Sequence, residues 1–119
     1  MRKKKNKPPF EIMIIIVNYG EGDKVVELLK NNNIPLTLQM QGRGTAESEV
    51  ADIFGFGVVE RDVVACFVEE ERSRALVEMV YTDLKLDMEH TGLVFTIQPS
   101  GATMDLIKTL KIEVWYGKN

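Results

Sequence analysis

A pattern of apolar residues that recurs after about 51 residues constrains the fold of this chain more than any single motif. The shift lays Val17 on Val68 and the run Val25–Leu29 on Leu76–Val80. Each copy reads as strand, helix and strand. Two such units packed together make the ferredoxin-like βαββαβ sandwich of the α+β class, a four-stranded antiparallel sheet with two helices on one face.

The spacing of apolar side chains sets the expected elements. Runs of β-branched residues predict buried strands, and apolar residues at i, i+3 and i+4 predict helices. Asp23 is the expected N-cap of the first helix, because its carboxylate can accept a bond from an N–H of the first turn. We expect strands at Glu11–Asn18, Leu36–Met40, Asp62–Val68 and Leu93–Gln98, and helices at Lys24–Lys30 and Ser73–Leu86.

These elements place the ferredoxin-like domain at residues 10–99, between a basic tail at 1–9 and a C-terminal extension at 100–119. The extension begins at a break, Pro99-Ser100-Gly101, and Thr103–Leu110 reads as a short helix. Lys111–Tyr116 alternates charged and apolar residues. It reads either as an edge strand or as a segment that docks on a neighbouring subunit.

The strands carry apolar residues on both faces. In Ile12–Val17 and in Val63–Val68 the residues of both parities are apolar, although the helices can cover only one face of the sheet. Apolar area left in water costs about 25 cal/mol per Å². We therefore expect an oligomer whose sheets face inward.

Charge is placed unevenly along the chain. The 119 residues fit one domain, and five of the 15 basic residues precede Glu11, the first of the 18 acidic ones, which leaves the body with a net charge of −8. Such a body does not suit nucleic acid. The tail Arg2–Lys7 reads as a solvated, disordered terminus, with contact to RNA or an anionic membrane as the alternative.

Several classes of protein are disfavoured. No apolar run approaches the ~20 residues that span a bilayer, and Arg2–Val17 lacks the cleavage site of a signal peptide. Cys66 stands alone in an apolar run, which is typical of a buried thiol in a reducing compartment such as the cytoplasm. With His90 as the only histidine, a multi-histidine metal site is excluded, and we expect no metal.

The stretch Gln41–Arg61 is far longer than the ~2–5 residues of a tight hairpin loop. Its start, Gly42-Arg43-Gly44-Thr45, suits an anion. The glycines let backbone N–H groups approach a ligand closely, the guanidinium matches phosphate or carboxylate, and the threonine adds a hydroxyl. A plain surface loop is the alternative interpretation.

The order of these elements resembles the PII-type nitrogen regulatory proteins and their PII-like relatives. The resemblance covers roughly Glu11 to Gln98. It includes the long loop after the second strand and the short turn before the fourth. The residues that carry it are Ile14–Val17 with Asp23–Val25, then Gly42–Thr45, then Thr91–Phe95.

This resemblance implies a cytoplasmic homotrimer that regulates a target protein, either a transporter or an enzyme. Adenine nucleotides or other small effectors bind between the subunits of that family, and the long loop, called the T-loop, engages the target. Gly42, Arg43 and Gly44 match the glycine-rich base of the loop that meets phosphates. Thr37 matches a threonine near the adenine, and His90-Thr91-Gly92 loosely matches the turn that closes over the phosphates.

The chain also departs from the family pattern. Residues 41–61 contain no tyrosine, so nucleotidylation is not available, and Thr91 stands where a basic residue is expected next to Gly92. With Arg43 as the main cation a triphosphate would be under-neutralised. ADP, AMP or a different anion therefore remains open beside ATP. These departures indicate a divergent PII-like protein rather than a close nitrogen regulator.

Two other classes of function fit the sequence less well. A small enzyme on a ferredoxin-like frame lacks an evident catalytic set. An RNA-binding sheet of the RRM kind needs exposed aromatics and a basic surface, and it is the least favoured alternative. His90 is either an exposed turn residue or a ligand contact. Phe54 and Phe56 either dock on a partner or fold back on their own trimer.

Overall fold

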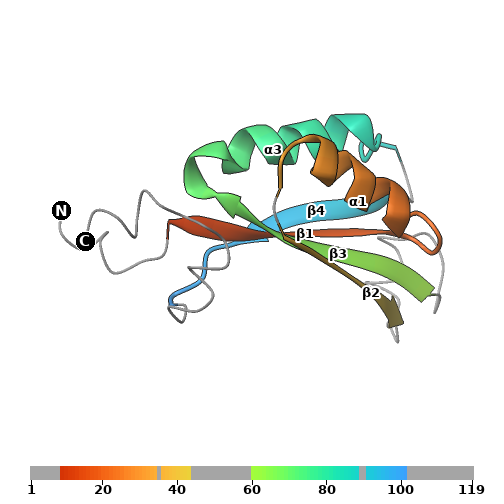
Figure 1. Ribbon diagram of the computed structural model, residues 1–119. Helices are drawn as coiled ribbons and strands as arrows, with labels where there is room; N and C mark the ends of the chain where they lie inside the picture. Colours follow the sequence, from red (N-terminus) through yellow and green to blue (C-terminus); the bar gives the residue numbers. More distant parts are fainter. Residues whose placement is uncertain (1–8, 35, 44–59, 89–90, 102–119) are drawn as a thin grey trace.

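Two helices cover one face of a four-stranded sheet in the computed structural model of the chain (Figure 1). The structure describes residues 9–34, 36–43, 60–88 and 91–101. The elements are β1 (Phe10–Asn18), α1 (Gly22–Asn31), β2 (Thr37–Arg43), β3 (Glu60–Glu69), α3 (Glu70–Asp83) and β4 (Gly92–Ile97). This order and layering confirm the predicted α+β, ferredoxin-like fold.

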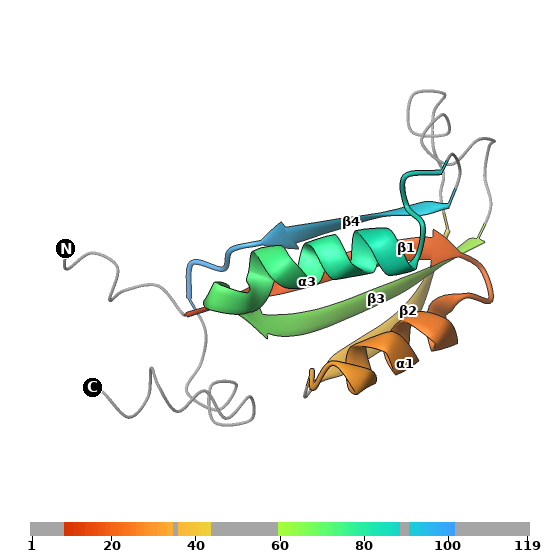
Figure 2. The same cartoon turned by 90° about the horizontal axis from the view of Figure 1, so that it is seen from above.

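The strand order is β2-β3-β1-β4, and every neighbouring pair is antiparallel. Each strand–helix–strand copy therefore crosses over one strand of the other copy: β3 lies between β1 and β2, and β1 lies between β3 and β4. Figure 2 shows α3 above the β1 side of the sheet and α1 above the β2 side. The two copies are thus interleaved in one sheet, as the repeat predicts.

Alternate residues of the two central strands build the core beneath the helices. Met13, Ile15 and Val17 of β1 are fully or almost fully buried, and α1 and α3 close over them. Every second residue of a strand points to the same face of the sheet, and each helix carries an apolar stripe on one side. The side chains on the helix-facing side of the strands are therefore the buried ones. The same hydrophobic core also includes Val64, Cys66 and Val68 on β3, Val25 and Leu29 on α1, and Leu76 and Val80 on α3.

The ends of the elements differ from several expectations. Asp23 lies inside the first turn of α1, so the prediction that it is the N-cap is wrong; Glu21 is the N-cap residue and makes no side-chain cap bond. Helix α3 spans 70–83 rather than 73–86. Strand β2 continues to Arg43, and strand β3 begins at Glu60. Residues 41–43 and 60–61 are therefore paired strand residues rather than loop.

Both helices end in the same way, one copy repeating the other. In α1 the N–H groups of Asn33 and Ile34 donate to the carbonyls of Lys30 and Leu29, at 3.1 and 3.2 Å. In α3 the N–H groups of Lys85 and Leu86 donate to the carbonyls of Thr82 and Tyr81, at 3.1 and 2.9 Å. These are Schellman motifs, whose C′ residue takes a left-handed conformation. That residue is Asn33 (φ 62°) in α1 and Lys85 (φ 55°) in α3.

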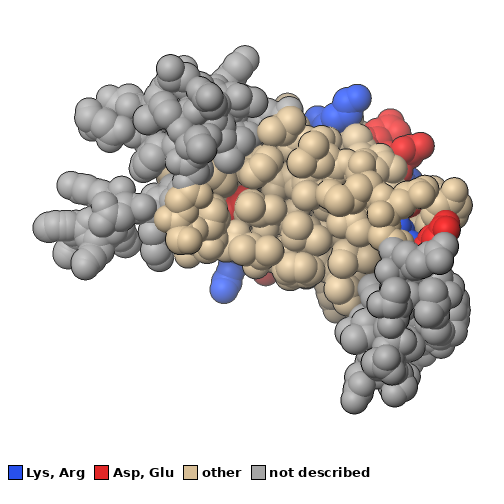
Figure 3. All heavy atoms as spheres, turned by 90° about the horizontal axis from the view of Figure 1, so that it is seen from below, with Lys and Arg blue, Asp and Glu red and all other residues tan. Residues whose placement is uncertain are grey.

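The face of the sheet opposite the helices is apolar across all four strands. The register aligns its residues in rows, because paired residues of an antiparallel ladder share a face. Four of these side chains are 42–50% exposed: Leu38, Met40, Phe95 and Ile97. Figure 3 shows this face with few charged side chains among the described residues. The rows are Leu38–Ala65–Ile14–Phe95, Met40–Val63–Ile16–Leu93 and Phe67–Ile12–Ile97.

Some expectations concern residues that the structure does not describe. The basic tail, apart from Pro9, and the extension beyond Gly101 lie outside the described residues. Residues 44–59 of the long loop do so as well.

Candidate functional site

One end of the sheet holds most of the candidate site residues that the structure describes. There Asn18 pairs with Arg61, Arg61 pairs with Gly42, and Val17 pairs with Gly92. This is the end at which β2 stops and β3 begins, and therefore the root of the segment 44–59. Residues of all four strands therefore meet this end of the sheet.

Gly42 and Arg43 form the β2 part of this root. Both are paired with β3, opposite Arg61 and Glu60. A Cβ on Gly42 would meet Val63 Cγ2 at 3.4 Å, which is a tight but not prohibitive contact. The glycine is therefore not demanded by packing within one chain.

Arg61 is a cation at this end that the sequence reasoning did not assign to the site. Its residue is only 7% exposed, and Nη1 donates to Asn18 Oδ1 at 3.2 Å. It lies on the face opposite the helices, in register with Gly42. Burial lowers the pKa of the Arg61 guanidinium, but arginine stays charged in proteins. In the sequence Arg61 stands directly before an apolar strand. It was not recognised as a site residue because it was assigned to the loop 41–61 rather than to the strand.

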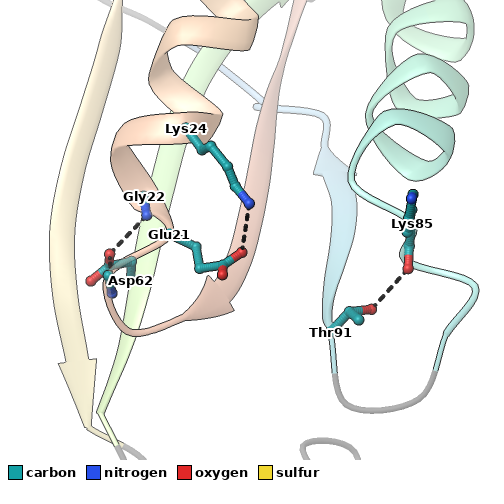
Figure 4. A network of polar contacts seen from close by, with 7 residues as sticks. Glu21, Gly22, Lys24, Asp62, Lys85 and Thr91 are labelled. Carbon is teal, nitrogen blue, oxygen red and sulfur yellow. Dashed lines mark hydrogen bonds and ion pairs between the residues drawn. The ribbon is translucent and has the colours of Figure 1, made fainter.

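Asp62, the next residue of β3, faces the helices and anchors the turn between β1 and α1. Its Oδ2 accepts hydrogen bonds from the N–H groups of Gly20 and Gly22, at 2.9 and 2.8 Å. The carboxylate therefore satisfies the start of α1 and complements the positive end of its dipole. Figure 4 shows the bond from Gly22 and the position of Asp62 beside the turn.

Gly92 begins the fourth strand at the same end of the sheet, and Thr91 directly precedes it. Thr91 Oγ1 donates to the carbonyls of Lys85 and Met88, at 3.1 and 2.8 Å, and so closes the turn after α3. Gly92 has φ 143°, and a Cβ there would lie 2.2 Å from the Ile16 carbonyl oxygen. Only glycine fits that position, whatever the turn binds.

The two halves of the expected site lie on opposite edges of the sheet. β2 and β4 are separated by β3 and β1, so Gly42 and Gly92 are about 14 Å apart at a ladder spacing of ~4.8 Å. Thr37 pairs with Cys66 and lies five residues before Gly42, about 17 Å along the strand. One chain therefore does not bring Thr37, the glycine-rich base and Thr91-Gly92 into contact with one small ligand.

Gly44, Thr45, Phe54, Phe56, His90 and the side chain of Arg43 lie outside what the structure describes. Within the described ranges, no three His, Cys, Asp or Glu side chains gather as metal ligands would. In the same ranges no helix is long and apolar enough to cross a membrane.

Cys66 is fully buried in the middle of β3. Desolvation raises the pKa of its thiol to about 12. A thiol with so high a pKa is protonated at neutral pH and is a poor nucleophile. This agrees with the expectation of a buried small hydrophobe.

The fold is shared with several solved structures. CutA from Synechococcus elongatus, complexed with Bis-Tris, is similar at a TM-score of 0.65 and 6% identity, over 88% of this chain and 94% of that one. PII of Arabidopsis thaliana bound to citrate is similar at 0.59 and 14% identity, over 76% and 78%.

The GlnK–ATP complex of B. subtilis is similar at a TM-score of 0.55 and 16% identity, over 76% of this chain and 82% of the other. No protein-family model and no curated protein matches this sequence. At such identities the likeness concerns the fold, which is the ferredoxin-like fold of the PII and CutA proteins.

Proposed function

We propose that this chain is a PII-like regulatory protein without catalytic activity of its own. It binds a small anionic effector at the root of the segment 44–59 and uses that segment to act on a target protein. The observation that carries the proposal is the convergence of Gly42, Arg43 and Arg61 at one end of the sheet, on the two strands that bound the segment. A ligand held there touches both ends of the segment and can shift its conformational population.

The apolar face supports an oligomer, and a homotrimer is the proposed state. Three rows of apolar side chains cross the sheet on the face without helices. Covering them with other copies removes apolar area from water. In one chain Gly42 and Gly92 are about 14 Å apart, too far to hold one small ligand between them. In an oligomer a neighbouring copy can supply the second wall of a cleft.

An adenine nucleotide is the proposed effector class, with ADP, AMP and ATP as candidates and another small anion as the alternative. Arg61 adds a guanidinium, on the face of Gly42, to the end of the sheet that Arg43 occupies in the sequence, and its positive charge favours an anion. Two solved proteins of this fold carry anions of these types, ATP in one and citrate in the other.

Thermal shift against ATP, ADP, AMP and citrate tests the proposal. A ligand at a hundredfold excess over its Kd stabilises the folded state by ~2.7 kcal/mol. We expect at least one of these anions to raise the Tm, and Arg43→Ala to remove the increase. Arg74→Ala, on the exposed side of α3, is the matched control and should keep it. If none of the anions raises the Tm of the unmodified protein, the proposed effector class is wrong.

A further inference from the structure

A hollow on the helix side of the sheet is separate from the loop root on the opposite face. It lies between the start of α1 and the turn that follows α3, and its volume is about 530 Å³. Volumes of about 300–1,000 Å³ are usual for small-molecule sites. It is lined by Val17, Asn18, Glu21, Lys24, Leu28, Asp83, Leu84, Lys85 and Thr91.

Among the residues that the structure describes, the charges of this lining are balanced. Two carboxylates, of Glu21 and Asp83, and two ammonium groups, of Lys24 and Lys85, share the hollow. A simple anion would meet both carboxylates and a simple cation both lysines, so neither has an electrostatic advantage. A ligand that carries one charge of each sign can oppose each to its complement.

The uncharged part of the lining indicates the rest of the ligand. Val17, Leu28 and Leu84 contribute aliphatic surface, whereas the polar side chains of Asn18 and Thr91 are already hydrogen-bonded, to Arg61 and to the carbonyls of Lys85 and Met88. Ligand sites combine mostly apolar walls with a few polar groups that fix orientation. An apolar side chain on a zwitterionic head matches this division.

The ion pair on α1 does not lock the hollow. Lys24 Nζ lies 3.3 Å from Glu21 Oε1, and the two side chains are 64% and 48% exposed. Exposed pairs of this kind contribute little to stability, so a ligand can replace either partner. Figure 4 shows the pair projecting from α1 toward the turn that carries Lys85 and Thr91.

Lys85 provides an independent indication that this turn has a role besides ending a helix. It holds the left-handed C′ position of α3, at φ 55°, where glycine or asparagine is the usual residue. The equivalent position of α1 is Asn33, at φ 62°. A lysine in this conformation carries a backbone penalty that asparagine and glycine largely avoid. Outliers of this kind cluster at ligand sites, and here the strained residue lines the hollow.

We propose that this hollow binds a free α-amino acid with an apolar side chain. The ammonium groups of Lys24 and Lys85 attract its carboxylate, the carboxylates of Glu21 and Asp83 attract its ammonium group, and its side chain lies on Val17, Leu28 and Leu84. No covalent step is involved. The site is distinct from the anion site proposed at the loop root, although Asn18 lines the hollow and also accepts a hydrogen bond from Arg61.

Isothermal titration of the full-length protein with leucine, isoleucine, valine and methionine tests the proposal. Each amino acid is compared with its N-acetyl derivative and its amide, which keep the side chain but carry one charge each. We expect at least one amino acid to bind, and both of its derivatives to bind at least tenfold more weakly. Equal binding of a derivative, or no binding of any of the four amino acids at 10 mM, overturns the proposal.

Lys85→Gly separates function from stability, because it removes the charge and relieves the backbone strain together. We expect its Tm to rise by ~2–5 °C while the affinity for the amino acid falls about tenfold or more. Asn33→Gly is the matched control at the end of α1 and should leave the affinity unchanged. Unchanged affinity in Lys85→Gly, or a lower Tm, contradicts the role assigned to this lysine.

Discussion

Asp62 on β3 holds the start of α1, which lies 40 residues earlier in the chain, through a hydrogen bond of 2.8 Å from the N–H of Gly22. The same Oδ2 accepts from the N–H of Gly20 at 2.9 Å. Because Asp62 follows Arg61, which belongs to the loop root, this contact joins the root to the β1–α1 turn. The β1–α1 turn also carries Glu21, which lines the hollow between the start of α1 and the turn that follows α3.

Replacing Asp62 by alanine should destabilise the fold by about 2–3 kcal/mol, because two N–H groups lose their acceptor and one of them is buried. Urea denaturation followed by circular dichroism measures the free energy of unfolding. Asp23→Ala is the control, since Asp23 only complements the helix dipole in the first turn and should cost below ~1 kcal/mol. Equal losses in the two variants would contradict the anchoring role of Asp62.

Gly22→Ala should also destabilise the protein, although alanine is normally the better residue in a helix by ~1 kcal/mol. The added Cβ would lie 2.5 Å from Gln39 Nε2 and 2.9 Å from Asp62 Oδ2, so the end of the Gln39 side chain and the Asp62 carboxylate that anchors the helix must move. Differential scanning calorimetry should show a lower Tm. Gly101→Ala, where no atom lies within 4 Å of the added Cβ, should leave the Tm unchanged.

The pKa of Cys66 gives the protein a defined response to alkaline pH. The folded-state pKa of about 12 lies above the unfolded value near 9.0, so the folded state keeps its proton where the unfolded state loses it. This contribution to stability is fully present below pH 9 and is lost as the pH rises toward 12, at a limiting ~1.4 kcal/mol per pH unit. Cys66→Ala should flatten that part of the stability profile; an unchanged slope would contradict the assignment.

The same burial predicts that thiol reagents do not reach Cys66 in the native protein. At pH 8 we expect a disulfide reagent such as DTNB to label the protein only after denaturant is added. Rapid labelling of the native protein would show that β3 is not covered by α1 and α3 as described.

Phe95 lies on the apolar face of the sheet, and its replacement tests whether copies of the chain contact each other there. It is 42% exposed in a single chain, so Phe95→Glu should leave the fold intact while it places a charge in the contact between copies. Size-exclusion chromatography with light scattering should show a trimer for the unmodified protein and a smaller species for this variant. Tyr81→Glu, at 47% exposure on α3, is the control and should remain trimeric. A monomeric unmodified protein would refute the homotrimer.

The repeat of apolar residues predicted the fold because each copy carries its own periodicity, which does not depend on distant contacts. The buried face of the sheet and the second apolar face follow from the same periodicity. Such features are local in sequence, and single-chain patterns therefore reveal them.

The features that sequence reasoning missed depend on distant partners. Gly42 and Arg43 lack a strand-like pattern and were assigned to a loop, but the ladder with Arg61 and Glu60 extends β2 through them. The start of α1 needs no cap from Asp23, because Asp62 supplies it from another strand. The left-handed conformation of Lys85 could not be predicted from the sequence either, because it follows from the hydrogen bonds that end α3.

Amide chemical shifts of the isotope-labelled protein during a titration with ATP, ADP, AMP or citrate test the central claim most directly. The account predicts that a binding anion perturbs the amides of Gly42, Arg43 and Arg61 at the loop root, while those of Val68 and Glu69, at the opposite end of β3, keep their positions. Perturbations confined to other parts of the chain, or no change with any of the four anions, would contradict it.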